Sequence, residues 1–279
     1  MQNPQLYLKI GNQPEFNIED KVQGLRYLGD NATPVITNNF LDVSGVDGSQ
    51  FQYSTFTRYQ IPANFFIRFG TWQDFKLAKH QFYRLFGQRK LIRMRTDVES
   101  NIVRFVYPNL PEIKPTEDKA HYASFTMNFD NPSGYRYSLY RSDAISEALD
   151  RSLQFGMSAT NKKEDMNYHF TSTSFSVYNP SDIAIDPYGQ KHDLKIICHF
   201  NGNSLTLSNS TNGSEWSYQK GANSSDTIIL DGISTTLNGN AASANTDYGN
   251  IILEPGKNNI NVSGANNVDI TFSFPFIYI

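Results

Sequence analysis

The sequence predicts a mainly β protein of two domains, with one α-helix in the first domain. Three observations predict this fold class. The chain has 279 residues, which is long for one domain and comfortable for two. Aromatic residues make up 14% of the chain and charged residues only 18%, below the usual quarter. Strand-like alternation occurs in both halves, whereas a clear helical period occurs in one segment of the first half.

The helical period lies in residues 71–88, TWQDFKLAKHQFYRLFGQ. Thr71 and Asp74 have the spacing of a capping box, with Asp in place of the usual Glu or Gln. Gly87 stands where a helix stops. Apolar residues recur at helical intervals and predict the buried face: Trp72, Phe75, Ala78, Phe82, Leu85 and Phe86. We therefore expect an amphipathic helix between Thr71 and Gly87.

Three strands are predicted after this helix. The first is KLIRMRT (90–96), and the second is NIVRFVY (101–107), which we expect Pro108 to end. In the third, HYASFTMNFD (121–130), the apolar residues Ala123, Phe125, Met127 and Phe129 alternate with polar ones. This alternation is typical of an antiparallel strand with one buried face.

The second domain follows a turn-rich segment, DNPSGYRYSLYRSDAISEALD (130–150). We place the boundary there, with domains at 1–135 and 136–279. Beyond it six strand-like runs without helical period favour a sandwich or jelly roll. These runs are TSFSVYN, HDLKIICHF, NSLTLSN, SDTIILDG, GNIILEPG and NVDITFSF.

A search for catalytic and metal-binding patterns finds none that the spacing supports, so we expect no cofactor. The five histidines (80, 121, 169, 192 and 199) match no zinc motif, and one cysteine cannot build a cysteine-rich site. Cys198 lies in an alternating run beside His199, and adjacent strand residues point to opposite faces. A buried thiol is therefore favoured over a Cys–His dyad. Glu164 and Asp165 could serve a glycosidase only if the fold paired carboxylates at the required separation.

The chain also lacks the marks of secretion and of membrane insertion. No basic start and apolar core open the sequence, and a single cysteine cannot form an internal disulfide. No apolar stretch approaches the roughly 20 residues that cross a bilayer. We expect folding in a reducing cytoplasm. The sequons at Asn209, Asn212, Asn223 and Asn261 are then chance matches in a segment rich in Asn and Ser.

Charge is distributed unevenly along the chain. Residues 199–279 contain only two Lys or Arg residues, Lys220 and Lys257. Two separate cations are not the basic cluster that binds a nucleic-acid backbone. By contrast, the segment from Phe75 to Thr96 has seven basic residues and no acidic one. It is either a solvated surface or a subunit interface that meets acidic residues of another copy. The predicted interface residues are Arg84, Arg89, Lys90, Arg93 and Arg95.

The order of these segments resembles the distal tail proteins (Dit) of siphophages that infect Gram-positive bacteria. The resemblance runs nearly end to end. In the first half it rests on VSGVDGSQF with its Asp47-Gly48 turn, on IPANFFIRF, on the helix, and on the NIVRFVY and ASFTMNF strands. In the second half it rests on SLQFGM, on FSVYNPSDIAIDP, and on LEPGKNNINV followed by VDITFSF.

The resemblance implies a structural virion protein at the tail tip, assembled in the host cytoplasm, with no enzymatic activity. It implies a homo-hexameric ring whose N-terminal β domain lines a channel and whose C-terminal domain is a galectin-like β-sandwich. The implied partners are the tail tube protein, the tail-associated hub protein and a receptor-binding or baseplate protein. The resemblance implies neither binding to sequence-specific nucleic acid nor insertion into a membrane.

Within this framework LEPGKNNINV is expected to be a framework hairpin. Pro255 would fix φ and Gly256 would accept the positive φ of a type II turn. Leu253, Ile260 and Val262 would anchor consecutive strands in the core of the sandwich.

Two other function classes remain open from the sequence. A carbohydrate-binding module could stack a sugar ring on Trp216 and Tyr218, which alternate on one strand-like segment, although both could equally be core residues. A glycoside hydrolase would require a pair of carboxylates that the sequence does not identify.

Overall fold

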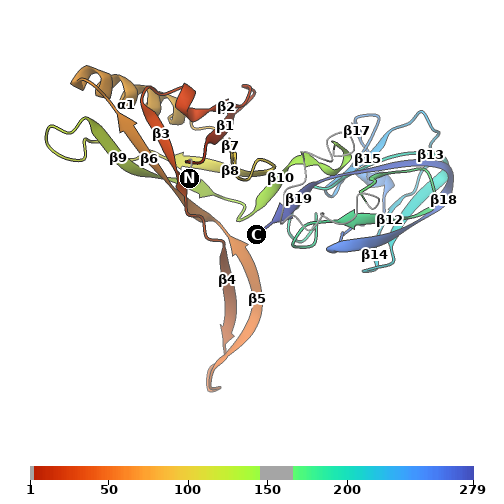
Figure 1. The fold of residues 1–279 in the computed structure, drawn as a ribbon. Helices are drawn as coiled ribbons and strands as arrows, with labels where there is room; N and C mark the ends of the chain where they lie inside the picture. Colours follow the sequence, from red (N-terminus) through yellow and green to blue (C-terminus); the bar gives the residue numbers. More distant parts are fainter. Residues whose placement is uncertain (1–2, 145–165) are drawn as a thin grey trace. The chain divides into compact units, whose positions relative to one another are not determined.

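The computed structural model describes residues 3–144 and 166–279 and divides them into two compact units. Unit 1 comprises the residues up to Arg136 together with Ile279, and unit 2 comprises Tyr137–Tyr278. Figure 1 shows the elements of both. In these described ranges, every helix is too short or too polar to cross a membrane.

The main sheet of unit 1 is antiparallel, and its strands follow the order β2-β1-β7-β8-β9-β6-β3. A 3-10 turn, η1 (Ile18–Asp20), follows β2. The strands are β1 (Leu6–Ile10), β2 (Phe16–Asn17), β3 (Leu25–Asp30), β6 (Tyr59–Arg68), β7 (Ile92–Thr96), β8 (Ile102–Asn109) and β9 (Tyr122–Asn131).

Helix α1 (Trp72–Phe86) covers one face of this sheet (Figure 1). The predicted capping box is confirmed: the Thr71 hydroxyl accepts the N–H of Asp74 at 3.1 Å, and the Asp74 carboxylate accepts the N–H of Thr71 at 2.9 Å. Phe82 meets Phe65 of β6 edge to face, with ring centroids 5.6 Å apart. These aromatic contacts build the core of unit 1.

Two details of the predicted first half are wrong. Trp72 is 56% exposed. Its indole lies against Phe75 and beneath the Lys76 ammonium. Pro108 does not end β8, since the strand continues to Asn109 and Pro108 pairs with Phe129. Strand β9 is as predicted, with Ala123, Met127 and Phe129 buried.

A separate two-stranded hairpin extends from unit 1 (Figure 1). It consists of β4 (Val35–Asp42) and β5 (Ser49–Thr57), and its strands pair only with each other among the described residues. We call residues 35–57 the apolar hairpin and residues 43–48 its tip.

Unit 2 is built around two long antiparallel strands, β13 (Lys195–Asn209) and β18 (Gly256–Ser273). At one end they pair with β11, β15 and, through β15, β16 and β17; at the other end with β12 and β14. The remaining strands are β10 (Arg136–Arg141), β11 (His169–Phe170), β12 (Ser174–Asn179), β14 (Ser214–Tyr218), β15 (Ile228–Asp231), β16 (Ser234–Leu237), β17 (Asn240–Ala241) and β19 (Pro275–Tyr278), with 3-10 turns η2 (Ser142–Ala144) and η4 (Ser243–Asn245).

The length of these two strands corrects the predicted strand count. HDLKIICHF and NSLTLSN form one strand, because the residues around Gly202 make register shifts rather than a turn. A Cβ at Gly202 would lie 2.8 Å from the carbonyl oxygen of Gly264, so the two long strands approach closely where they bend.

The predicted LEPGKNNINV hairpin is wrong. Leu253 bridges to Ile185, whereas Ile260 and Val262 lie in β18, which pairs with β12 and β13. The segment before Pro255 is therefore not the partner of the strand that follows it. All three apolar residues are nevertheless buried.

Candidate functional site

Cys198 and His199 do not form a dyad. Cys198 is fully buried, and burial raises the pKa of its thiol far above the usual value. His199 lies on the other face of β13 and contacts the carbonyl oxygen of Asp226 at 2.9 Å. Within residues 3–144 and 166–279, no three His, Cys, Asp or Glu side chains are grouped to hold a metal ion.

The aromatic platform proposed for a sugar is wrong. Trp216 is 0% and Tyr218 1% exposed, because both side chains point from β14 into the core, where Tyr218 meets Phe200. Neither ring face can stack on a saccharide in this fold. Glu164 and Asp165, considered for a glycosidase, and the SLQFGM segment lie outside the described residues.

Two of the predicted interface arginines have an acidic partner within their own chain. Glu15 accepts a hydrogen bond from Arg93 Nη2 at 2.8 Å and from Arg95 Nε at 2.9 Å. Burial alone would raise the pKa of Glu15, but the hydrogen bonds and charges of Arg95 and Arg93 outweigh it, so that its pKa lies below the usual value. The partner expected on another subunit is therefore present locally. The sequence could not show this, because Glu15 is distant along the chain.

The other three predicted interface residues, Arg84, Arg89 and Lys90, are exposed and form no ion pair with any described residue. They lie at the C-terminal end of α1 and in the link to β7. We call these three residues the basic edge.

A hollow of about 400 Å³ adjoins the basic edge at the end of α1. Phe16 and Leu85 supply apolar surface, Lys21 and Arg84 supply positive charge, and three glutamines complete the lining. The Lys21 ammonium lies over the Phe16 ring at 5.4 Å. No acidic residue lines this hollow, which we call the α1-end pocket.

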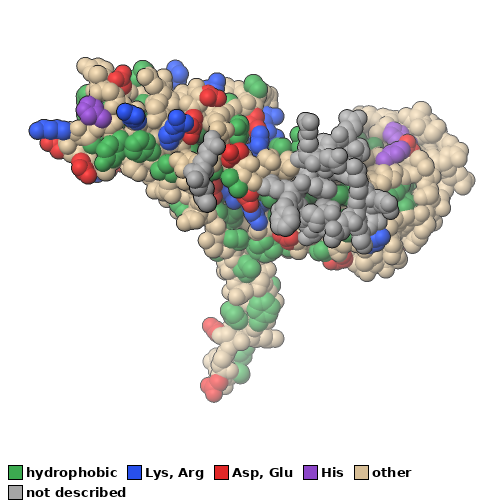
Figure 2. All heavy atoms as spheres, viewed as in Figure 1, with side chains coloured by type: hydrophobic (Ala, Val, Ile, Leu, Met, Phe, Trp, Pro, Cys, Tyr) green, Lys and Arg blue, Asp and Glu red, His purple; other side chains and the backbone are tan. Residues whose placement is uncertain are grey.

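The apolar hairpin is the site that the sequence analysis did not identify. Its exposed apolar side chains lie on both strands and at the tip, and Figure 2 shows hydrophobic and acidic side chains along it. The exposed side chains are Val35, Ile36, Phe40, Leu41, Val43, Val46, Phe51 and Tyr53, each between 41% and 64% exposed. Phe40 and Phe51 pair across the strands with centroids 5.8 Å apart.

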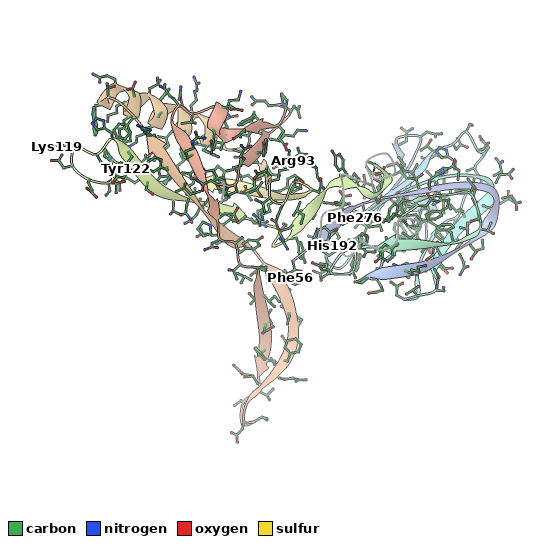
Figure 3. The ribbon with its side chains drawn as sticks, viewed as in Figure 1. Phe56, Arg93, Lys119, Tyr122, His192 and Phe276 are labelled. Carbon is green, nitrogen blue, oxygen red and sulfur yellow. The ribbon has the colours of Figure 1, made fainter. Side chains whose placement is uncertain are left out.

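Several contacts fix the base of this hairpin to unit 1. Phe56 lies where β5 meets the body of the unit (Figure 3), and its ring packs on Tyr135 at 5.4 Å. Gly134 has a positive φ of 76°, and a Cβ there would lie 2.9 Å from the carbonyl oxygen of Thr57. Close backbone packing at this point thus requires glycine.

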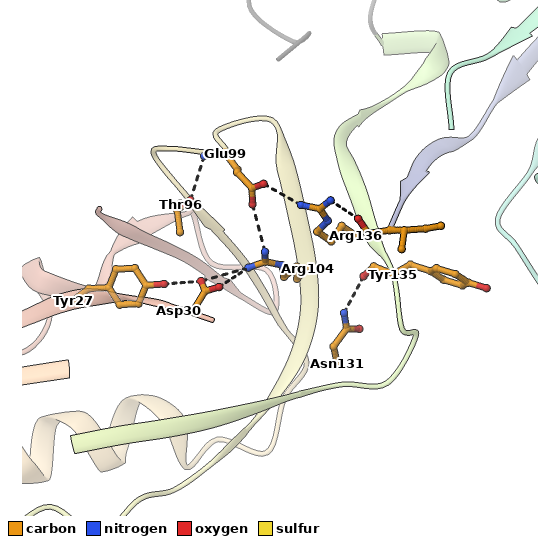
Figure 4. A network of polar contacts seen from close by, with 9 residues as sticks. Tyr27, Asp30, Thr96, Glu99, Arg104, Asn131, Tyr135 and Arg136 are labelled. Carbon is orange, nitrogen blue, oxygen red and sulfur yellow. Dashed lines mark hydrogen bonds and ion pairs between the residues drawn. The ribbon is translucent and has the colours of Figure 1, made fainter. Parts of the chain in front are cut away.

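Figure 4 shows an ionic network within unit 1. Arg104 pairs with Asp30 at 3.2 Å and with Glu99 at 3.4 Å, and Tyr27 donates to Asp30 at 2.6 Å. Arg136 pairs with Glu99 at 3.0 Å and also donates to the backbone carbonyl of Ile279. Because each charge has a partner, the network serves to hold strands β3 and β8 together rather than to react.

The four predicted turn residues lie at two different places. Asp47 and Gly48 belong to the tip of the apolar hairpin, where Gly48 has a φ of 82°. Pro255 precedes β18, and Gly256, its first residue, has a φ of 91°. The positive φ expected at Gly256 is therefore present, although the turn does not close a hairpin.

The comparison with protein families matches residues 11–131 to the phage tail protein RIFT-related domain. This part of the chain is therefore similar to a phage tail domain. The matched range contains the apolar hairpin, α1, the basic edge and the α1-end pocket.

Solved structures show that the likeness extends beyond this domain. The crystal structure of SPP1 Dit (gp 19.1), described as a paradigm of the hub adsorption apparatus in phages that infect Gram-positive bacteria, matches with a TM-score of 0.66 and 13% identity. The match covers 97% of this chain and 99% of that one. The chain therefore has a Dit-like fold, and the resemblance predicted from the sequence is confirmed.

Two structures of the phage p2 baseplate in its activated conformation, with Sr and with Ca, also match. Their TM-scores are 0.42 and 0.39 at 12% and 13% identity, over 98% of both chains in each case. The comparison with curated proteins finds no match.

Proposed function

We propose that this protein is a structural component of the phage tail tip and forms a ring of identical subunits, with six as the expected number. The RIFT-related domain would line the central channel, and unit 2 would be a galectin-like sandwich outside it. The ring would join the tail tube protein to the tail-associated hub protein and to a receptor-binding or baseplate protein. It would be assembled in the host cytoplasm and would have no enzymatic role.

The observation that carries this proposal is the apolar hairpin. A two-stranded hairpin is at best marginally stable alone in water, and contiguous exposed apolar patches mark interaction sites. This hairpin exposes phenylalanine and aliphatic side chains on a two-stranded sheet that joins no other described strand. Association with another chain would remove this surface from water.

Subunit association in a closed ring fits the same observation. Identical subunits that meet through two different surfaces form rings when the rotation between them closes. The apolar hairpin would be one of these two surfaces, and the other would lie elsewhere on the same chain. Its fixed base, formed by Phe56, Tyr135 and Gly134, would hold this surface at a defined angle.

Light scattering coupled to size exclusion tests the proposal. The wild-type chain, of 31.7 kDa, should elute as an oligomer, and Phe40→Ser with Phe51→Ser should shift it toward monomer. Tyr188→Ser, which removes a comparably exposed aromatic ring from unit 2, should leave the oligomer unchanged. A wild-type monomer at all accessible concentrations would contradict the ring.

The sequence argument for a carbohydrate-binding role was that a sugar could stack on Trp216 and Tyr218, and both residues are buried. We therefore expect no saccharide binding through these residues. Glycan-array binding by the intact chain that survives Trp216→Phe would point to a different sugar site.

A further inference from the structure

We propose that the tip of the apolar hairpin of one copy inserts into the α1-end pocket of a second copy. This inference rests on the proposed ring and names the two surfaces that meet. The occupant is Val46, with Val43 beside it, and the acidic residues of the hairpin face the basic edge of the receiving copy.

Charge complementarity identifies the receiving surface. Residues 35–57 contain Asp42 and Asp47 and no lysine or arginine. The α1-end pocket has Lys21 and Arg84 in its lining and no acidic residue, and Arg89 and Lys90 adjoin it along the chain. Opposite charges of this kind steer association and fix its register.

The apolar parts also correspond. Val46 is 64% exposed, the highest fraction among the apolar residues of the hairpin. The pocket offers Phe16 and Leu85 as apolar surface. A hollow of about 400 Å³ falls within the size of ordinary binding pockets and accommodates aliphatic side chains.

The occupant must come from another copy. Unit 1 is one compact body, and the hairpin tip and α1 lie at opposite ends of it in Figure 1. The base contacts of Phe56 with Tyr135 and the close packing at Gly134 hold the hairpin in that direction. The tip therefore cannot reach the pocket of its own chain, and the contact runs head to tail.

Disulfide trapping tests the contact directly, because a disulfide forms only between residues whose Cα atoms lie within about 7 Å. In a Cys198→Ala background, Val46→Cys with Gln88→Cys should give a ladder of covalent oligomers on mild oxidation. Gln88 lines the pocket. Either cysteine alone can give at most a covalent dimer, and Val98→Cys with Gln88→Cys is the matched control, since Val98 is 65% exposed but distant in sequence from the hairpin.

A ladder with the 46/88 pair and none with the 98/88 pair supports the proposal. If the oxidised 46/88 protein forms an oligomer of normal mass without cross-links, this docking is wrong while the ring stands. If the protein is monomeric before oxidation, the ring itself fails, so the two failures are distinguishable.

A charge exchange provides a second test that needs no cysteine. Asp47→Arg and Arg84→Asp should each weaken association about tenfold or more, with circular dichroism unchanged because both side chains are exposed. Combining them should recover most of the loss. Additive weakening in the double variant would overturn the pairing.

Discussion

The Asn258 side chain binds both backbone polar groups of Glu254: its Oδ1 accepts the N–H of Glu254 at 2.8 Å, and its Nδ2 donates to the carbonyl oxygen of Glu254 at 2.8 Å. Asn258 is fully buried and also accepts a hydrogen bond from Asn209 at 2.9 Å. The Asn258 and Asn209 amides therefore supply hydrogen bonds at a place where a hairpin would have cross-strand backbone hydrogen bonds.

Asn209 is itself fully buried, so its sequon is not accessible in the folded chain.

We predict that Asn258→Ala lowers the free energy of unfolding of unit 2 by about 2–3 kcal/mol, because it leaves buried backbone groups without partners. Urea unfolding followed by tryptophan fluorescence measures this, since Trp216 lies in the core of unit 2. Asn259→Ala, at the exposed neighbouring position, should be nearly neutral. Equal effects of both changes would contradict the buried-network explanation.

Gly256→Val should destabilise unit 2 by more than about 1 kcal/mol, because a β-branched residue resists a φ of 91°. No atom lies within 4 Å of the position that a Cβ would occupy there, so the cost is conformational rather than steric. Gly256→Asn should therefore be milder than Gly256→Val, since Asn tolerates the left-handed region. A melting transition equal to that of the wild type would remove this argument.

Local patterns predicted the parts of the fold that depend on neighbours in sequence. The helix between Thr71 and Gly87 and the alternation in β9 follow from spacing alone, and the structure confirms both. The long strands were missed because Asn and Gly around position 202 are turn residues in sequence, yet here they form a bend held by Gly264. Only contact between distant strands decides between these outcomes.

The candidate site was predictable only in part. The run of basic residues is visible in the sequence. Glu15 forms ion pairs with Arg93 and Arg95 of this run, and no residue next to them in the sequence indicates this pairing. The apolar hairpin shows ordinary strand alternation, so its exposure follows from its lack of a partner sheet rather than from its composition. From the sequence alone, these apolar residues would be expected in a hydrophobic core.

Glu15 predicts an acid-sensitive contribution to the stability of unit 1. Its folded pKa lies below the usual 4.5, so its stabilisation is complete above about pH 4.5 and is lost as the pH falls through the folded value. Glu15→Gln should therefore lower stability at pH 7 and show a smaller further loss on acidification than the wild type. Denaturant unfolding at both ends of this range measures the difference.

The control for this measurement is Glu112→Gln, because the Glu112 side chain is 77% exposed and pairs only loosely with Lys114. This change should leave both stability and its pH dependence nearly unaltered. A parallel acid response in the Glu15→Gln variant and the wild type would show that Glu15 is not the group responsible.

Reversal of Arg93 and Arg95 to Glu should impair folding of unit 1 instead of giving a folded monomer. Three carboxylates would then lie where one carboxylate and two guanidinium groups now pair, and unpaired charges in a partly buried site are costly. Circular dichroism and thermal melting test this. A folded variant with a wild-type melting temperature would show that the Glu15 pairs contribute little and that these arginines are free for another role.

The central claim is that identical copies of this chain close into a ring through a hairpin that no single copy can cover. Negative-stain imaging of the purified, untagged chain tests it most directly, because a ring is recognised without knowledge of its partners. We predict annular particles with a central hole in the wild type, and their loss when Phe40 and Phe51 are both changed to Ser. Isolated monomers in the wild type, or rings that persist in the double variant, would contradict the account.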